Sequence, residues 1–436
     1  MLPATARDRC SARAASFATT WERPDHLPTR GAAPAAQRRH SVKFARRGAD
    51  ARAATAERWS KRSASAGTPD GFKLCLHLYA PLPHNDRSVA LASHADLTTM
   101  SHTLIVLPDD TAKPIIDGLD AAVRSINIRM FLFTDPTLLD TVIAARKRGV
   151  HVRVMLNPAR RSGESENEAS RQVLTAAGVE VRDSSPAFAL THQKSMVIDD
   201  AVGYVESLNW ETRDLTETRD YAVVTTHAIE VSEMVKCFEA DWAQRAFVPD
   251  PRSRLIWCPN NGRERIAAFI DSAQETLWLQ NERYQDTVII ERLVRAVKRG
   301  VRVHIMARPP HTLKKDKLVE GVGGLRIMHD VGAKVHRLKA LKLHGKMLLA
   351  DDSRGIVGSI NLSPGSFDAR RELAIATDAP HVVKRLVHMS QHDWENSRPL
   401  DLSDEGLLAD LEKHSAKGVD RLALETHHHH KGHAKS

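Results

Sequence analysis

The chain has 436 residues, 42% of them hydrophobic, which is enough to bury two ordinary cores of about 100 to 200 residues each. Its net charge of +9 would normally favour nucleic acid or an anionic membrane as a partner, but residues 1–66 carry 14 Lys and Arg against 5 Asp and Glu. The rest holds 49 charges of each sign, so the overall basicity does not indicate a nucleic-acid-binding surface on the globular part.

The cysteines and the hydropathy indicate the compartment. The four cysteines show neither metal-ligand spacing nor a pairing pattern, which favours a reducing compartment; they are Cys10, Cys75, Cys237 and Cys258. No apolar run reaches the roughly 18 residues needed to cross a bilayer, and the N-terminus lacks the apolar segment of a signal peptide. We therefore expect a cytoplasmic protein, at most peripheral to a membrane.

The two ends of the chain differ from its middle. Residues 1–100 are rich in Ala, Arg and Ser without a sustained period, which predicts a largely disordered basic extension. Two alternatives stay open: an Arg-rich targeting peptide, or upstream sequence before a true start at Met100. Residues 401–436 predict a C-terminal helix and a His-rich tail, in which His427–His430 could bind a metal, although a solvated tail is the simpler interpretation.

From residue 101 onward, short strand-like runs alternate with helical stretches. The runs rich in β-branched or aliphatic residues are 126–133, 150–156, 179–183, 194–199, 203–208 and 221–226. Residues 135–149 predict a helix that begins at Asp135 and Pro136 and ends at Gly149. This alternation predicts an α/β fold with a mixed or parallel sheet covered by helices on both faces.

The pattern of the first half then repeats. RKRGVHVRVMLNP (146–158) aligns with VKRGVRVHIMARP (297–309), and HQKSMVIDDAVGYVESLN (192–209) aligns with HGKMLLADDSRGIVGSIN (344–361). Each copy is followed by a helical stretch that contains Asp-Trp. We therefore predict two pseudo-symmetric half-domains, 101–250 and 251–400.

The repeated phrase carries residues suited to binding phosphate. Side chains at positions i and i+2 of a strand share a face, so each copy can direct a His, a Lys, a Ser and an Asn toward one point. These are His192, Lys194, Ser207 and Asn209 in the first copy and His344, Lys346, Ser359 and Asn361 in the second. The set lacks the acidic ligands of a hard divalent metal, so we expect a phosphate site without one.

Two further positions of the phrase stand apart from that set. Asp199 and Asp351 follow their His by seven residues, an odd number, so alternation places them on the opposite face, where they can brace the sheet or a turn. Glu206 stands where the second copy has Gly358, and a glycine would let the backbone approach phosphate closely. Because Glu206 adjoins Ser207, we expect it to face away and to be tolerated, with weaker phosphate packing in the first half.

The pattern H-x-K-x4-D-x6-G-S-x-N, present twice, resembles the phospholipase D superfamily. The second copy matches every fixed position and the first departs only at Glu206, and the resemblance covers about 300 of the 436 residues. It implies a phospholipase D-like fold with one active site at the interface of the two half-domains, and neither cofactor nor metal. It also implies a catalytic set, which here is His192, His344, Lys194, Lys346, Asp199 and Asp351.

In this superfamily one histidine attacks phosphorus to form a phosphohistidine, and the other protonates the leaving alcohol and then activates water or an acceptor alcohol. The resemblance thus implies a phosphodiesterase or phosphatidyltransferase, with His192 as the nucleophile and His344 as the acid. Asp220 and Glu372 each follow the His of their half by 28 residues, and we expect them to orient the histidines.

The superfamily does not by itself fix the substrate. A phospholipid head group is favoured by the neutral globular part, the 5% aromatic content and the segment NLSPGSFDARRE, which resembles cardiolipin synthase-type sequences, although their usual two membrane spans are missing. A metal-independent endonuclease is the first alternative, supported by basic residues after strand ends: Arg160, Arg161, Arg308, Lys314, Lys315 and Lys317. A non-catalytic phosphate-binding protein is the second, supported by Glu206. The oligomeric state stays open.

Overall fold

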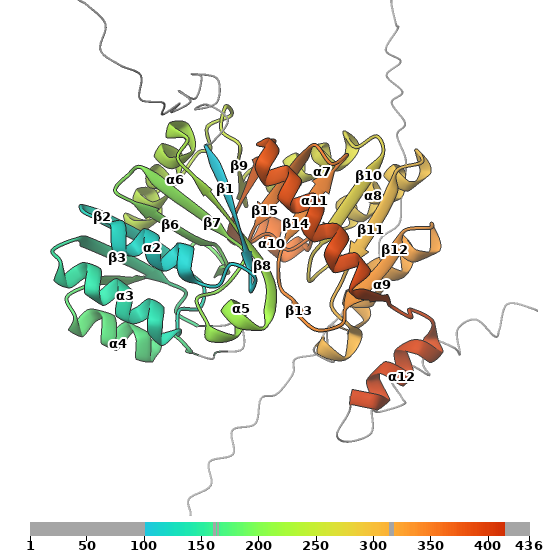
Figure 1. The fold of residues 1–436 in the computed structure, drawn as a ribbon, viewed down its shortest axis with the longest axis horizontal. Coiled ribbons are helices and arrows are strands. Elements are labelled where there is room, and N and C mark those ends of the chain that lie inside the picture. The colour runs from blue at the N-terminus through green and yellow to red at the C-terminus, as the bar shows by residue number, and fades with distance from the viewer. Residues whose placement is uncertain (1–100, 160–162, 164, 314–317, 415–436) are drawn as a thin grey trace, which may run out of the picture. The chain divides into compact units, whose positions relative to one another are not determined.

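The computed structural model describes residues 101–159, 163, 165–313 and 318–414. Three sets of residues named above lie outside the described residues. They are the extension 1–100, the His427–His430 run, and five of the six basic residues, all but Arg308. The described halves belong to one compact unit. Figure 1 shows them as two α/β bodies, the first blue to green and the second yellow to red. This confirms the predicted fold class, because each half is a mixed sheet flanked by helices.

The elements of the first half follow the predicted order. Its strands are β1 His102–Leu107, β2 Ser125–Met130, β3 His151–Leu156, β4 Glu180–Asp183, β5 Leu190–Thr191, β6 Lys194–Ile198, β7 Val202–Glu206 and β8 Thr218–Thr225. Its helices are α2 Lys113–Ala121, α3 Pro136–Lys147, α4 Glu168–Ala176, α5 Thr212–Thr216 and α6 Ala228–Trp242. The predicted helix start is confirmed, since the Asp135 carboxylate accepts a hydrogen bond from the Leu138 amide at 3.0 Å.

The second half repeats this arrangement. Its strands are β9 Leu255–Cys258, β10 Thr276–Gln280, β11 Arg302–Met306, β12 Lys334–Leu338, β13 Lys342–Leu343, β14 Met347–Ala350, β15 Arg354–Gly358, β16 Arg370–Thr377 and β17 Ser397–Pro399. Its helices are α7 Gly262–Asp271, α8 Thr287–Lys298, the short η1 Pro310–Thr312, α9 Leu318–Asp330, α10 Pro364–Asp368, α11 Pro380–Glu395 and α12 Asp404–His414. None of the described helices is long and apolar enough to span a membrane.

The two sheets share one topology and exchange one short strand each. The first sheet has the strand order β1-β8-β7-β6-β2-β3-β4. The corresponding order in the second sheet is β9-β16-β15-β14-β10-β11-β12. The two-residue strand β5 of the first half pairs in parallel with β16 of the second. In return, β13 of the second half pairs in parallel with β8 of the first. Each exchanged strand directly precedes a His-x-Lys motif, so the exchange determines where the histidines lie.

Three apolar clusters stabilise this arrangement. One lies within each half, between the sheet and the helices on its outer face, α2 and α3 in the first half and α7 and α8 in the second. The third is shared, because Val205 and Tyr221 of the first half pack with Val357 and Leu373 of the second. Helices α6 and α11 contribute to this shared cluster, and α11 crosses the centre of the view in Figure 1. Burial of the inner sheet faces therefore depends on both halves being present.

The repeated Asp-Trp of the sequence has a structural reason. Asp393 on α11 accepts a bidentate ion pair from Arg219 of β8, with Nη2 to Oδ1 at 3.0 Å. Asp241 on α6 accepts the matching pair from Arg371 of β16, with Nη2 to Oδ1 at 2.9 Å. All four side chains are buried, and each pair joins one half to the other.

Candidate active site

The exchanged strands place each motif histidine against a strand of the opposite sheet. After β5, the amides of His192 and Gln193 both donate to the Arg371 carbonyl of β16 at 3.0 Å. After β13, the amides of His344 and Gly345 donate to the Arg219 carbonyl of β8 at 3.3 and 2.7 Å. Each histidine is therefore held by the backbone of the half to which it does not belong.

The orienting carboxylates also come from the opposite half. Nδ1 of His192 donates to Oε2 of Glu372 at 3.0 Å, and Nδ1 of His344 lies 3.0 Å from both carboxylate oxygens of Asp220. Both carboxylates are fully buried. A carboxylate on Nδ1 fixes the tautomer and leaves Nε2 to react. The sequence identified both carboxylates, but their equal spacing in each half did not indicate that the pairs cross between halves.

The His192 ring lies in an apolar and cationic environment. Its centroid is 5.0 Å from that of Phe131, and only 8% of the residue is exposed. Burial lowers the pKa of His192 to about 3; Glu372 opposes this shift, while Lys194 and Lys346 add to it. The ring is therefore neutral at physiological pH, as a nucleophile must be.

The two lysines lie beside the histidines and interact across the halves. Lys194 is fully buried and donates from Nζ to the His192 carbonyl at 2.7 Å, and Lys346 donates to the His344 carbonyl in the same way. Burial lowers the pKa of Lys194 to about 7, and the positive charge of Lys346 lowers it further. Two ammonium groups that repel each other in a buried site would each be stabilised by an anion between them.

The serines of the motif do not lie open to a ligand, contrary to the prediction. The Ser207 hydroxyl donates to Asp220 at 2.6 Å and accepts from the Tyr221 amide at 2.9 Å. The Ser359 hydroxyl donates to the Leu373 carbonyl and accepts from its amide, at 3.2 and 3.1 Å. Both residues are fully buried. Alternation relates each serine only to the residues of its own strand, so it did not reveal the neighbouring strand that binds the hydroxyl.

The asparagines keep binding capacity. Asn209 donates from Nδ2 to Asp214 at 2.8 Å, and the Oδ1 atoms of Asn209 and Asn361 are buried without a hydrogen-bond partner. A buried amide oxygen without a partner costs free energy, so a ligand that supplies a donor would be favoured there.

The comparisons with known proteins agree with this geometry. The family described as cardiolipin synthase, PLD-like domain matches residues 115–242 and again 266–394, more than half of the chain. The chain belongs to this family, and hence to the phospholipase D superfamily. Each match contains one His-x-Lys motif, so the superfamily expectation drawn from the repeated phrase is confirmed.

Relatives of this family member are found among curated proteins and solved structures. Cardiolipin synthase A of Pseudomonas entomophila (strain L48) is 25% identical over 349 residues, covering 69% of this chain and 70% of the relative. Cardiolipin synthase 1 of Bacillus anthracis is 22% identical over 391 residues, covering 75% and 74%. The structure of phosphatidylserine synthase from Haemophilus influenzae superposes with a TM-score of 0.58 at 12% identity over 72% of this chain and 92% of that one, which supports the fold alone.

The aspartates of the family motif lie outside the reacting set, so their assignment as catalytic is corrected. Asp199 accepts hydrogen bonds from the amides of residues 123–125, with Ser125 at 2.7 Å. Asp351 accepts from the amides of residues 274–276, with Glu275 at 2.7 Å. Both have positive φ, 53° and 52°, in a turn that a short acid tolerates. They fix the tight turns after β6 and β14, as the alternation argument predicted.

Glu206 differs from the expectation in one respect. As predicted, its side chain points to the opposite face of the strand from Ser207. The β6–β7 register pairs Glu206 with Lys194, so these two side chains share a face. Lys194 therefore lies on the opposite face from Ser207, and the four motif residues do not share one face. Glu206 is fully buried and accepts from Trp210 Nε1 at 2.8 Å. Burial raises the pKa of Glu206 to about 8, against the opposing effects of Trp210 and Lys194. A neutral carboxyl does not repel phosphate.

The equivalent Gly358 is required by its neighbours in the sheet rather than by a ligand. A Cβ atom there would lie 2.3 Å from the Leu373 carbonyl oxygen and 2.4 Å from Cα of Ala374. Strand β16 thus approaches β15 too closely for any side chain. We expected this glycine to be needed for the close approach of phosphate, whereas in the structure the adjacent strand requires it.

Two acidic residues of the site were missed by the sequence argument. Glu282, after β10, accepts from Lys346 Nζ at 2.8 Å and from Arg308 at 2.7 Å, and its Oε2 lies 3.8 Å from His344 Nε2. Asp214, on α5, lies 3.6 Å from His344 Nδ1. The repeat offered a signal for both, since the equivalent positions are Phe131 and Ser366 and the two halves therefore differ there.

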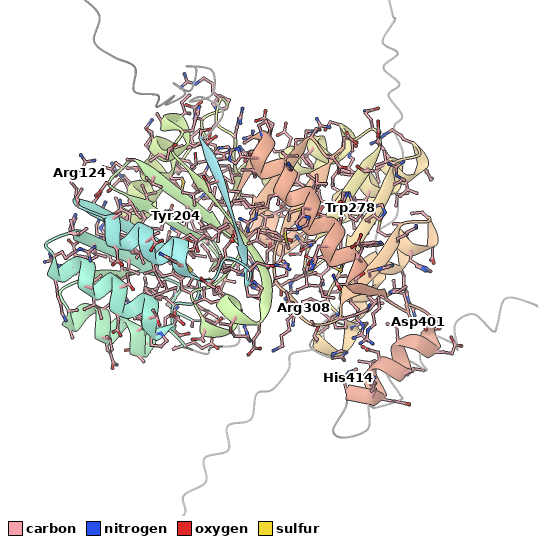
Figure 2. All side chains as sticks on the ribbon, viewed as in Figure 1. Arg124, Tyr204, Trp278, Arg308, Asp401 and His414 are labelled. Carbon is pink, nitrogen blue, oxygen red and sulfur yellow. The ribbon has the colours of Figure 1, made fainter. Side chains whose placement is uncertain are left out.

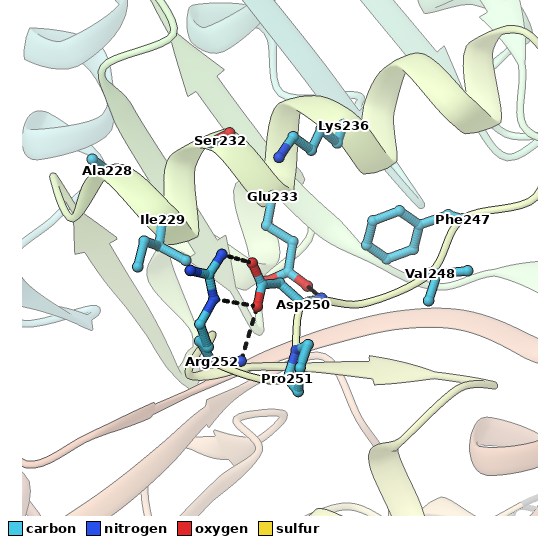
Figure 3. Close-up of a pocket in the computed structure, with 10 residues that line it drawn as sticks. All are labelled: Ala228, Ile229, Ser232, Glu233, Lys236, Phe247, Val248, Asp250, Pro251 and Arg252. Atoms are coloured by element: carbon cyan, nitrogen blue, oxygen red, sulfur yellow. Dashed lines mark hydrogen bonds and ion pairs between the residues drawn. The ribbon is translucent and has the colours of Figure 1, made fainter.

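A cavity of about 360 Å³ opens beside His344 and is lined by Asp214, Glu282, Arg308 and Lys342. Figure 2 shows Arg308 at the junction of the two halves. A larger cavity of about 820 Å³, drawn in Figure 3, lies between α6 and residues 247–252, away from both histidines, and its Asp250 is held by Arg252 at 2.7 Å. The smaller cavity is therefore the candidate substrate pocket.

Among the residues that the structure describes, two groups of side chains lie close enough to hold a metal ion. In the site these are Asp214, Asp220 and His344, and the second group is His311, Asp410 and His414. In the second group the two imidazoles stack in parallel, 14° apart with centroids at 3.7 Å, so their in-plane lone pairs run alongside each other rather than converge on one ion. That geometry is unsuited to tetrahedral coordination.

Proposed function

We propose that this protein is a phospholipase D-type phosphatidyltransferase or phosphodiesterase that cleaves a phospholipid head group through a covalent phosphohistidine, without a metal. Both predicted halves, 101–250 and 251–400, are needed for the site. The proposal rests on one observation: the two His-Lys pairs meet between the halves, and each His contacts a fully buried carboxylate of the other half.

In the first displacement, Nε2 of neutral His192 attacks phosphorus. The P–N bond forms as the bond from phosphorus to the head-group oxygen breaks, and that oxygen takes a proton from Nε2 of protonated His344. Glu372 accepts the hydrogen bond from Nδ1 of His192 and stabilises the positive ring. Lys194 and Lys346 stabilise the non-bridging oxygens as charge develops.

In the second displacement, neutral His344 takes a proton from water or an acceptor alcohol as its oxygen attacks phosphorus. The P–N bond breaks and His192 returns to its neutral form. Water as the acceptor yields phosphatidic acid, and an alcohol yields a new phosphodiester. His344 donates a proton in the first displacement and takes one back in the second, so both histidines return to their starting protonation states.

Phospholipid is favoured as the substrate by the family description and by the names of the curated relatives, which are cardiolipin synthases. We place the reaction at a membrane surface, where such a head group is presented. A metal-independent nuclease and a non-catalytic phosphate-binding protein are the other outcomes of the experiment.

The experiment incubates the purified full chain with EDTA and one of four substrates: vesicles of phosphatidylglycerol, vesicles of phosphatidylcholine, DNA, or a bis-aryl phosphate. Release of head-group alcohol, with transfer of the phosphatidyl group to added ethanol, is the expected result. His192→Ala and His344→Ala are the matched inactive controls. Cleavage of DNA with no action on lipid would assign the nuclease activity instead, and full activity in His192→Ala would exclude the two-histidine mechanism.

A further inference from the structure

We infer that Glu282 is a third functional carboxylate of the site. It binds Lys346 and lies beside Nε2 of His344 until substrate phosphate displaces it. Its negative charge favours His344, rather than His192, as the proton donor. This inference rests on the proposed function and extends it, because neither the motif nor the repeat assigns any role to Glu282.

Of the two pseudo-symmetric halves, only the second has a carboxylate at this position. The bridges Phe133–Trp210 and Tyr284–Leu362 are equivalent in the two halves, so Glu282 stands where the first half has Phe131. Phe131 packs on His192 and lies 5.1 Å from Lys194 Nζ, so that half has an aromatic face beside its lysine. The second half has a carboxylate on Lys346 instead.

The groups around the two histidines differ accordingly. His344 faces Asp220 and Asp214 on the Nδ1 side and Glu282 near Nε2, with Lys346 beside them. His192 faces Glu372, with Lys194 and Phe131 completing its surroundings. Three carboxylates lie within 4 Å of the His344 ring and only one contacts His192, so a positive charge that develops on a ring during the reaction is better compensated at His344.

Glu282 is the anion that contacts Lys346 and Arg308 in this structure. Its Oε2 is 2.8 Å from Lys346 Nζ, and its Oε1 is 2.7 Å from Arg308 Nη1. Although burial raises its pKa, Lys346, His344 and Arg308 hold the pKa of Glu282 well below the ordinary value, so it is ionised. A phosphate anion that binds Lys346 is repelled by this carboxylate, so we expect the phosphate to displace it from Lys346 while its contact with Arg308 remains.

The test compares Glu282→Gln with Glu275→Gln, an exposed carboxylate near the start of β10 that serves as the matched control. Removing one buried negative charge beside Lys346 should tighten binding of inorganic phosphate by about tenfold, measured by calorimetry at pH 6 with EDTA. The same variant should turn over phosphatidylglycerol vesicles about tenfold more slowly, with the basic limb of its pH profile moved to lower pH. Glu275→Gln should match the wild type in both measurements.

Tighter phosphate binding together with slower turnover distinguishes this role from a merely structural one, because a damaged site would bind phosphate more weakly. Unchanged or weaker phosphate binding in Glu282→Gln would overturn the inference. If the wild type cleaves no phosphodiester, the proposed function fails, while the phosphate measurement still decides whether Glu282 competes with an anion at Lys346.

Discussion

Nδ1 of His192 donates to Oε2 of Glu372 across 180 residues of sequence, at 3.0 Å. The contact joins the two halves, because His192 follows β5, which pairs with β16, the strand that carries Glu372. The corresponding contact of His344 with Asp220 arises in the same way, because His344 follows β13, which pairs with β8, the strand that carries Asp220. The candidate active site is thus assembled by strand exchange, and each of the two His-carboxylate pairs takes one residue from each half.

Removing the orienting carboxylate should therefore slow the reaction without unfolding the protein. Glu372→Gln keeps the size of the side chain but weakens its hold on the His192 tautomer, and we expect kcat to fall by about 10- to 100-fold. The assay is turnover of phosphatidylglycerol vesicles, with the thermal midpoint measured beside it. Glu239→Gln, which alters a partly exposed ion pair with Arg153, is the control. Wild-type turnover in a folded Glu372→Gln would contradict the proposed role of Glu372.

The two histidines should respond differently to the leaving group. A nitrophenolate leaves without protonation, so His344→Ala should still form the phosphoenzyme from a bis-nitrophenyl phosphate while losing about 10²- to 10⁴-fold in rate on an alkyl head group. His192→Ala should form none. Rapid-quench measurement of acid-labile phosphoprotein separates the two variants. A phosphoenzyme in His192→Ala and none in His344→Ala would reverse the assignment.

Binding of a phosphodiester should weaken as the pH rises through about 7. Lys194 has a pKa lowered to about 7, so its charge is present below that pH and lost above it. Arginine stays charged throughout, so Lys194→Arg should remove this pH dependence. Calorimetry with dimethyl phosphate, whose single charge is constant in this range, gives the dissociation constants between pH 6 and 8. An affinity of the wild type that does not change with pH would refute the prediction.

Glu206 should make the stability of the protein depend on pH. Its pKa is raised from 4.5 to about 8, so between these values the folded state binds a proton that the unfolded state has lost, and stability falls as the pH rises through this window. Glu206→Gln cannot ionise and still offers Trp210 an acceptor. We expect its advantage over the wild type to grow by on the order of 1 kcal/mol per pH unit up to about pH 8. Urea denaturation at several pH values measures this, and parallel curves for the two proteins would be inconsistent with a buried, protonated Glu206.

The motif aspartates should affect stability rather than chemistry. Asp199→Ala leaves three backbone amides without their acceptor, and we expect a loss of about 2 kcal/mol in the free energy of unfolding. In the folded fraction, kcat should stay within about twofold of the wild type, since no reacting group contacts Asp199. Asp351→Ala should behave alike. Denaturation curves and kcat at low temperature test both; a stable but inactive variant would return these residues to the catalytic set.

The sequence alone determined the secondary-structure elements and the superfamily of this protein. Strand alternation and helix boundaries are local, so the strands, the helix begun by Asp135 and the turn role of Asp199 followed from residue order. The duplicated His-Lys phrase is also a local pattern, and it identified the superfamily and predicted the candidate reacting groups. Asp220 and Glu372 were found by their equal spacing from His192 and His344.

Only the tertiary structure decided which groups meet. Two-residue strands such as β5 and β13 have no periodicity of their own, and their pairing depends on hydrogen bonds to strands some 125 to 180 residues away. That pairing sends each histidine to the carboxylate of the other half. A local pattern tells which face a side chain takes but not what lies opposite that face. For this reason the hydrogen bond of Ser207 with Asp220, and the ion pair of Glu282 with Lys346, appeared only in three dimensions.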